Sequence, residues 1–147
     1  MFAVSAYNTG GGQARVVKSA DGFAAEPVWF NERFQNHHGG VVLLKDHLYG
    51  TSNAGLMCVD FKTGKTVWQD RCVGKGAVTY ADGRLYVRGE NGKVALVEAN
   101  PEKYVETGRF DQPDRSKQAA WPHPVVANGK LYLRDWDVLL CYDVKGK

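Results

Sequence analysis

Residues 45–60 read KDHLYGTSNAGLMCVD, residues 82–98 read DGRLYVRGENGKVALVE, and residues 128–143 read NGKLYLRDWDVLLCYD. Each stretch begins with a turn pair, continues as a Leu-Tyr strand, turns again, and ends as an apolar strand closed by an acidic residue. Tyr49 and Tyr86 are 37 residues apart, and an insertion in the polar loop 111–118 lengthens the next interval to 46 residues. The chain is therefore built from internal repeats of about forty residues.

The repeated element is predicted to be a β-hairpin. Asp82-Gly83 and Asn128-Gly129 each stand between two apolar runs, which is the strongest short-range signal of a hairpin. Helical repeats of similar length exist. However, no window of a dozen residues carries an apolar stripe at helical spacing without a glycine or a turn pair interrupting it. We therefore expect strands throughout and almost no helix.

Fourteen strands are expected in four units of three, four, four and three strands. The first unit is expected to lack its opening strand, with a turn at Gly10-Gly11-Gly12, and the last unit is expected to stop after its third strand. In the third unit the final strand is placed at residues 104–107. The unit boundaries are predicted near residues 1–36, 37–74, 75–118 and 119–147.

Units of four antiparallel strands that repeat at this interval are typical of a β-propeller. The predicted fold is therefore all-β: one partial propeller domain over residues 1–147, with about four blades that make a partial or half ring. The stretch CVDFKTGKTVW at residues 58–68 resembles the blade motif of the pyrroloquinoline-quinone (PQQ)-like repeat proteins, roughly Ala-x-Asp-x-x-Thr-Gly-x-x-x-Trp. The match runs through Asp60, Thr63, Gly64 and Trp68, with Cys58 in place of the usual Ala. Weaker copies follow at residues 94–105 and 139–147.

This resemblance implies structural roles for the motif residues. Trp68 is expected to pack into a slot against the neighbouring blade, and Gly64 to allow the tight turn that carries the strand back; an ordinary half-buried strand tryptophan would pack in almost the same way. Asp60 is expected to cap a turn. Residues 36–143 further resemble the C-terminal halves of large bacterial propellers of the quinoprotein-like or assembly-factor-like kind, which include both enzymes and scaffolds. Closed rings of this family have seven or eight blades, so four units suit part of a ring or of a longer chain.

A polar cluster gives the candidate ligand-binding residues. Asn36, His37 and His38 precede a glycine pair, and His123 stands between two prolines before a comparable first strand. Propellers bind ligands at loops near the axis, so these four residues could contact a ligand. The alternative is that they hydrogen-bond backbone where the chain crosses between blades. On a strand, adjacent His37 and His38 would face opposite sides and could not chelate one ion together, although in a loop they could. No metal site is predicted.

The three cysteines argue against a disulfide framework. Cys58 and Cys141 occupy the same repeat position, which favours buried core thiols over a metal pair. Cys72 follows the strand at residues 66–70 and could be exposed.

No catalytic residues are predicted. The chain lacks a phosphate-binding glycine loop, a Cys-x-x-Cys pair, a Gly-x-Ser-x-Gly elbow and a His-Glu-x-x-His helix. Quinoprotein dehydrogenases, as the resemblance implies, hold PQQ between a tryptophan and often a vicinal disulfide, with a calcium ion nearby, and this chain has no adjacent cysteines. We therefore expect a noncatalytic propeller module that needs no cofactor and presents loops for protein or small-ligand binding. The alternative is the C-terminal part of a quinone-dependent alcohol or sugar oxidoreductase, whose PQQ and calcium residues would lie mostly in other blades.

The charge pattern argues against a nucleic-acid partner. The net charge is +3, and the basic residues are interspersed with acidic ones rather than gathered in the stripe that nucleic-acid binding requires. No signal peptide or membrane span is expected after Met1. The expected partners are a second copy of the chain or the remaining propeller blades. Because propellers of this kind are often exported, a periplasmic or exported location is expected if the full-length protein carries an upstream signal.

Overall fold

The computed structural model describes residues 1–146, and these residues form fourteen strands and no helix, as the repeats predict. The strands are β1 (Phe2–Ser5), β2 (Gly10–Ser19), β3 (Gly22–Asn31), β4 (Val41–Leu44), β5 (His47–Ser52), β6 (Gly55–Asp60), β7 (Thr66–Asp70), β8 (Gly76–Ala81), β9 (Arg84–Gly89), β10 (Lys93–Glu98), β11 (Glu106–Asp111), β12 (Val125–Ala127), β13 (Lys130–Asp135) and β14 (Val138–Asp143). Over the described range no helix exists that could span a membrane.

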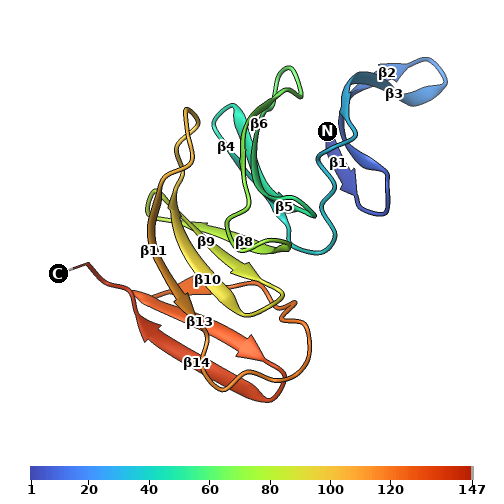
Figure 1. Ribbon diagram of the computed structural model, residues 1–147. Coiled ribbons are helices and arrows are strands. Elements are labelled where there is room, and N and C mark those ends of the chain that lie inside the picture. Colours follow the sequence, from blue (N-terminus) through green and yellow to red (C-terminus); the bar gives the residue numbers. More distant parts are fainter. Residues whose placement is uncertain (147) are drawn as a thin grey trace.

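The strands make four antiparallel sheets in which each strand pairs with its neighbour in sequence. The first sheet is β1-β2-β3, the second β4-β5-β6-β7, the third β8-β9-β10-β11 and the fourth β12-β13-β14. Figure 1 shows the four sheets following one another in chain order, with the first and fourth at opposite ends of the row. Strands β4 and β12 both contact β8, so the opening strands of the last three sheets lie next to one another. The strand count in every unit agrees with the prediction, and the described residues do not close a ring.

Turn chemistry fixes the hairpins. Asp82 and Gly83 both have positive φ, 48° and 76°, and Asn128 and Gly129 have φ of 51° and 70°. Two successive residues with positive φ are the mark of a type I′ turn, whose twist matches the strands that it joins. Each pair connects the first two strands of its sheet, in agreement with the sequence.

Apolar side chains fill the spaces between neighbouring sheets. The alternation of β6 sends Leu56 and Cys58 toward the third sheet and Met57 and Val59 toward the first. A third cluster joins the third sheet to the fourth and contains the buried residues Tyr86, Val94, Leu131 and Leu133. The core is therefore a series of layers between sheets rather than one central mass.

The first sheet differs from its prediction at the glycines. Residues 6–9 form the turn between β1 and β2, with Tyr7 and Asn8 at φ of 54° and 64°, and the glycine triplet begins β2 instead. A Cβ on Gly12 would lie 3.0 Å from the ring of Phe30, so this glycine admits the close approach of an aromatic ring. The predicted turn at Gly10-Gly11-Gly12 is wrong for that reason.

Three further expectations are corrected. The last strand of the third sheet is β11 at Glu106–Asp111 rather than residues 104–107. Cys72 is buried, because it packs into the cluster between the second and third sheets. Cys141 is exposed although Cys58, at the same repeat position, is fully buried, because β14 has no outer strand beside it and no sheet over it among residues 1–146.

Candidate functional site

The first two sheets each contact the next sheet through one tryptophan of the outer strand. Trp29 in β3 donates its Nε1–H to the carbonyl oxygen of Phe61 at 2.9 Å, and Trp68 in β7 donates to the carbonyl oxygen of Asn100 at 3.0 Å. The ring of Trp68 also lies 5.9 Å from that of Tyr104. We call Trp29 and Trp68 the docking tryptophans. Sequence reasoning named Trp68 alone, although Trp29 closes its own unit 39 residues earlier, which is about one repeat.

The other motif residues build the turn that receives the preceding docking tryptophan. Asp60 Oδ1 accepts hydrogen bonds from Thr63 N at 2.7 Å and Thr63 Oγ1 at 2.8 Å, and these bonds hold the pKa of Asp60 below its usual range. Gly64 has φ of 72°, and a Cβ there would lie 2.4 Å from the ring of Trp29. Glycine is therefore required at residue 64 by both the backbone conformation and the packed indole.

The candidate histidines lie on loops where the chain crosses from one sheet to the next. His37 and His38 are in the loop between β3 and β4, and His123 is in the loop between β11 and β12. His123 Nε2 lies 2.7 Å from the carbonyl oxygen of His38, and its ring covers Gly40, where a Cβ would be only 2.8 Å away. The fold thus brings together crossing loops that are 85 residues apart in sequence.

Asn36 holds the loop between β3 and β4 in place through hydrogen bonds to backbone. Its side chain is buried, and Nδ2 donates to the carbonyl oxygens of Gly40 at 3.2 Å and Thr51 at 2.9 Å. Both donor positions of the amide are thus used by backbone. This geometry gives Asn36 a structural role beside His37 and His38.

A continuous row of aromatic rings runs across these loops. Tyr7 lies 4.8 Å from His37, His37 lies 6.3 Å from His38, and His38 lies 5.4 Å from Trp121, measured between ring centroids. Tyr7 is 84% exposed and Trp121 is 60% exposed. We call Tyr7, His37, His38 and Trp121 the aromatic row. It connects the turn of the first sheet to the loop that enters the fourth.

One carboxylate holds the middle of the row in place. Glu90 Oε1 lies 2.9 Å from His38 Nε2, 3.2 Å from Trp121 Nε1 and 3.1 Å from Lys75 Nζ. Burial by itself would raise the pKa of Glu90, but the hydrogen bonds from His38 and Lys75 outweigh it and hold that pKa below its usual range. Because an ionised carboxylate only accepts hydrogen bonds, the His38 Nε2 atom carries a proton.

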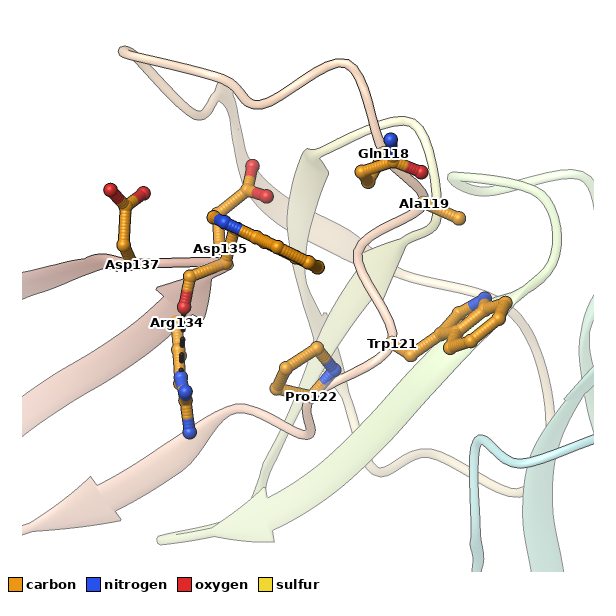
Figure 2. A pocket seen from close by; sticks show the side chains of 8 residues that line it. Gln118, Ala119, Trp121, Pro122, Arg134, Asp135 and Asp137 are labelled. Atoms are coloured by element: carbon orange, nitrogen blue, oxygen red, sulfur yellow. Dashed lines mark hydrogen bonds between the residues drawn. The ribbon is translucent and has the colours of Figure 1, made fainter.

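Beside Trp121 the surface opens into a cavity of about 700 Å³. Figure 2 shows Trp121 and Pro122 on one side of it and Arg134, Asp135 and Asp137 on the other. The lining also includes Trp136, which is 71% exposed. The full lining is Gln118, Ala119, Trp121, Pro122, Arg134, Asp135, Trp136 and Asp137.

A buried polar network supports this cavity. Asp135 is 2% exposed; its carboxylate accepts from Gln112 Nε2 at 3.0 Å, lies 3.2 Å from Arg115 Nε, and is also bonded by Ser116. Arg88, fully buried, donates to Gln112 and to the backbone of Arg134. Burial raises the pKa of Asp135, yet its bonds to Ser116 and Arg115 more than compensate and lower it. The network connects residues of β9 and β13 with the loop between β11 and β12, so no short sequence pattern predicts it.

Among residues 1–146, the acidic, histidine and cysteine side chains do not gather into a metal-ligand cluster. Within residues 1–146, no three or more His, Cys, Asp or Glu side chains gather closely enough to hold a metal ion. Calcium needs several carboxylate or carbonyl oxygens. The carboxylates nearest the cavity and the row, Asp135 and Glu90, instead form ion pairs with Arg115 and Lys75.

Comparison with known proteins confirms the resemblance to PQQ-like repeat propellers. Residues 3–70 match the PQQ-like family model that is described as outer membrane protein assembly factor BamB. Among 39 matching chains of solved structures is the crystal structure of BamB from Moraxella catarrhalis, with a TM-score of 0.58 and 16% sequence identity. The match covers 80% of this chain and 34% of that protein, and it establishes the propeller-type fold. A search of curated proteins finds no match.

Proposed function

We propose that this chain is a noncatalytic module of a PQQ-like repeat propeller that binds another polypeptide through the aromatic row and the adjoining cavity. The observation that carries the proposal is the exposure of Trp121 and Trp136 at a cavity of about 700 Å³, next to an aromatic row whose other end, Tyr7, is also exposed. Large aromatic side chains are enriched in the central part of protein interfaces and supply much of the binding energy there. Soluble proteins rarely leave such side chains clustered in water without a use.

The site is arranged in advance for binding. Glu90 fixes the positions of His38 and Trp121, and the network around Asp135 fixes the far wall of the cavity. A surface that is already ordered loses less entropy when its partner arrives, so more of the contact energy becomes affinity. These polar groups therefore serve to position the aromatic rings.

The same geometry supports binding rather than catalysis. His38 and Glu90 form a pair of the kind that orients a general base. A nucleophilic mechanism also requires a hydroxyl or thiol next to the histidine, and none in residues 1–146 hydrogen-bonds His37 or His38. We propose that the chain needs no cofactor for this binding role.

The family match supports a scaffold role without naming the partner. The matching family is described as an assembly factor, and we extend that kind of role to this chain. We further propose that the free face of the fourth sheet is covered by a second copy of the chain or by remaining propeller blades. Leu139 on this face is 67% exposed, whereas Leu56 at the same position of the second sheet is fully buried.

Selection of peptides tests the binding proposal. A library of random twelve-residue peptides displayed on phage is selected on the whole chain, and the enriched peptides are measured by calorimetry against variants. Trp121→Ala should weaken binding by at least tenfold, because interface tryptophans are frequent hot spots. Phe23→Ala is the matched control, because Phe23 is 78% exposed at the far hairpin of the first sheet. Failure to enrich any peptide, or equal binding by both variants, would contradict the proposal.

A second measurement addresses the oxidoreductase alternative. The chain is mixed with PQQ and calcium, and absorbance and dye-linked alcohol oxidation are followed. No added absorbance band and no oxidation are expected. A new band accompanied by turnover would replace the binding-module proposal with the enzymatic one.

A further inference from the structure

The third sheet lacks a docking tryptophan at the position where the first two sheets have one. The strand registers align the three positions: Trp29 pairs with Gln13, Trp68 pairs with Cys58, and Gly108 pairs with Leu96. In each sheet the pairing register shifts directly after the partner residue: after Gln13, after Cys58 and after Leu96. Gly108 therefore occupies the docking position of the third sheet with no side chain at all.

The aromatic residue of β11 stands two positions further along the strand. Phe110 packs on Tyr142 of the fourth sheet, with ring centroids 5.0 Å apart. This contact holds the third and fourth sheets together at another level. It leaves the space next to Gly108 without an indole.

A groove of about 790 Å³ lies where that indole would be expected. Its lining includes Leu96, which is the strand partner of Gly108, and Val144 and Lys145, which follow Asp143 as Phe61 follows Asp60. The docking tryptophans donate their N–H to carbonyl groups one or two residues after the acidic position. The carbonyl groups of Val144 and Lys145 correspond to these acceptors, and no donor within residues 1–146 bonds to them.

The charges around the groove favour a neutral ligand. Three charged side chains line it: Asp82, Arg84 and Lys145. Arg84 lies 3.6 Å from Glu98, while Asp82 and Lys145 carry opposite charges and form no ion pair with the described residues. The rim is therefore close to electrically balanced, and its interior is formed by Tyr86, Leu96, Val126 and Val144.

We propose that this groove binds an indole ring, supplied as an exposed tryptophan side chain by a partner polypeptide. The chain itself defines the chemistry of the occupant, because the two equivalent positions are filled by tryptophan and both indoles donate one hydrogen bond to backbone. Gly108 is exposed, and no residue of β11 lines the groove, so this side of the groove lacks the side chain that an indole would supply. This site is separate from the aromatic row and stands or fails independently of the proposed function.

The test uses N-acetyl-tryptophanamide as the probe and the whole chain labelled with ¹⁵N. Titration should shift the backbone amide signals of Leu96, Val144 and Lys145, with a dissociation constant in the low millimolar range. The naphthylalanine analogue keeps the ring size but lacks the N–H. It should bind roughly three- to tenfold more weakly, the usual effect of one hydrogen bond.

Variants decide whether the groove is the site. Gly108→Trp supplies the missing indole from β11 itself and should reduce binding of the probe by at least tenfold. Ala24→Trp is the control, because Ala24 is exposed in the first sheet, far along the chain from the groove. Equal binding by wild type and Gly108→Trp would overturn the proposal.

The wild-type spectra give a result that does not depend on the folding of either variant. Shifts confined to the amides around the groove support the proposal. Shifts confined to the cavity between Trp121 and Trp136, or no saturable shifts at all, would show that the groove does not bind indole.

Discussion

Replacement of Trp68 by alanine tests whether one side chain joins the second and third sheets. The change removes the indole hydrogen bond to Asn100, which is worth about 1 kcal/mol. It also removes ring contacts with Tyr49 and Tyr104, each worth about 0.5 to 1.5 kcal/mol. A fully buried tryptophan costs about 3 to 5 kcal/mol on truncation. Since Trp68 is half-buried, we expect a loss of about 2 to 4 kcal/mol in the free energy of unfolding.

Urea unfolding followed by far-ultraviolet circular dichroism measures this loss. With a slope of about 1.5 kcal/mol per molar, a loss of 3 kcal/mol lowers the midpoint by about 2 M. Trp68→Phe keeps an aromatic ring without the N–H and should lose only about 1 kcal/mol. Trp136→Ala is the matched control, because that indole is 71% exposed, and it should change stability by less than about 0.5 kcal/mol. A cost for Trp68→Ala no larger than that of the control would refute the docking argument.

Three further variant experiments and one measurement of mass extend these expectations. Gly64→Ala should cost at least about 2 kcal/mol more than Gly74→Ala, because both have positive φ but only a Cβ at residue 64 meets a docking indole, 2.4 Å away; equal midpoints in urea would show that the indole moves aside freely. Folding lowers the pKa of Asp135, so its ionised form stabilises the fold above about pH 4, and this contribution is lost as the pH falls through the folded pKa. The difference in unfolding free energy between wild type and Asp135→Asn should therefore narrow below about pH 4. A difference that stays constant from pH 7 to pH 3 would contradict this. Zinc should change the melting temperature of the wild type and of the His37→Ala, His38→Ala double variant equally, and a rise in the wild type alone would reveal a metal site. Light scattering during size-exclusion chromatography should show self-association that increases with concentration, whereas a stable monomer would mean that the free sheet faces need no cover.

The repeated pattern predicted the strands well because turn chemistry and alternation are local properties. Asp82-Gly83 and Asn128-Gly129 adopt the conformations that their residue types favour, whatever packs around them. The turn predicted at Gly10-Gly11-Gly12 was wrong because the local pattern cannot show which residues pack against these glycines. Their use depends on Phe2 and Phe30, which approach from other strands and leave no signal in the triplet itself.

The candidate site was predicted only in part. His37, His38 and His123 were singled out by their unusual surroundings, and the structure brings them together. Trp121 completes the row and Glu90 holds it in place, but they come from other units, 83 and 52 residues from His38. A single sequence does not reveal which charged residue of a turn will face a histidine from another loop.

The two equivalent cysteines show what a repeat can and cannot specify. Cys58 and Cys141 share the same position in the same local pattern, yet only Cys58 is buried. The pattern determines the direction in which each side chain points, while the next sheet in the row determines whether that direction leads to core or to water. Cys58 faces the third sheet, whereas the face that carries Cys141 and Leu139 has no sheet over it among the described residues. This face combines the sequence of an interior layer with the exposure of a surface. If a second copy or further blades cover it, as we propose, Cys141 should become buried, so the reactivity of its thiol would report on the covering sheet.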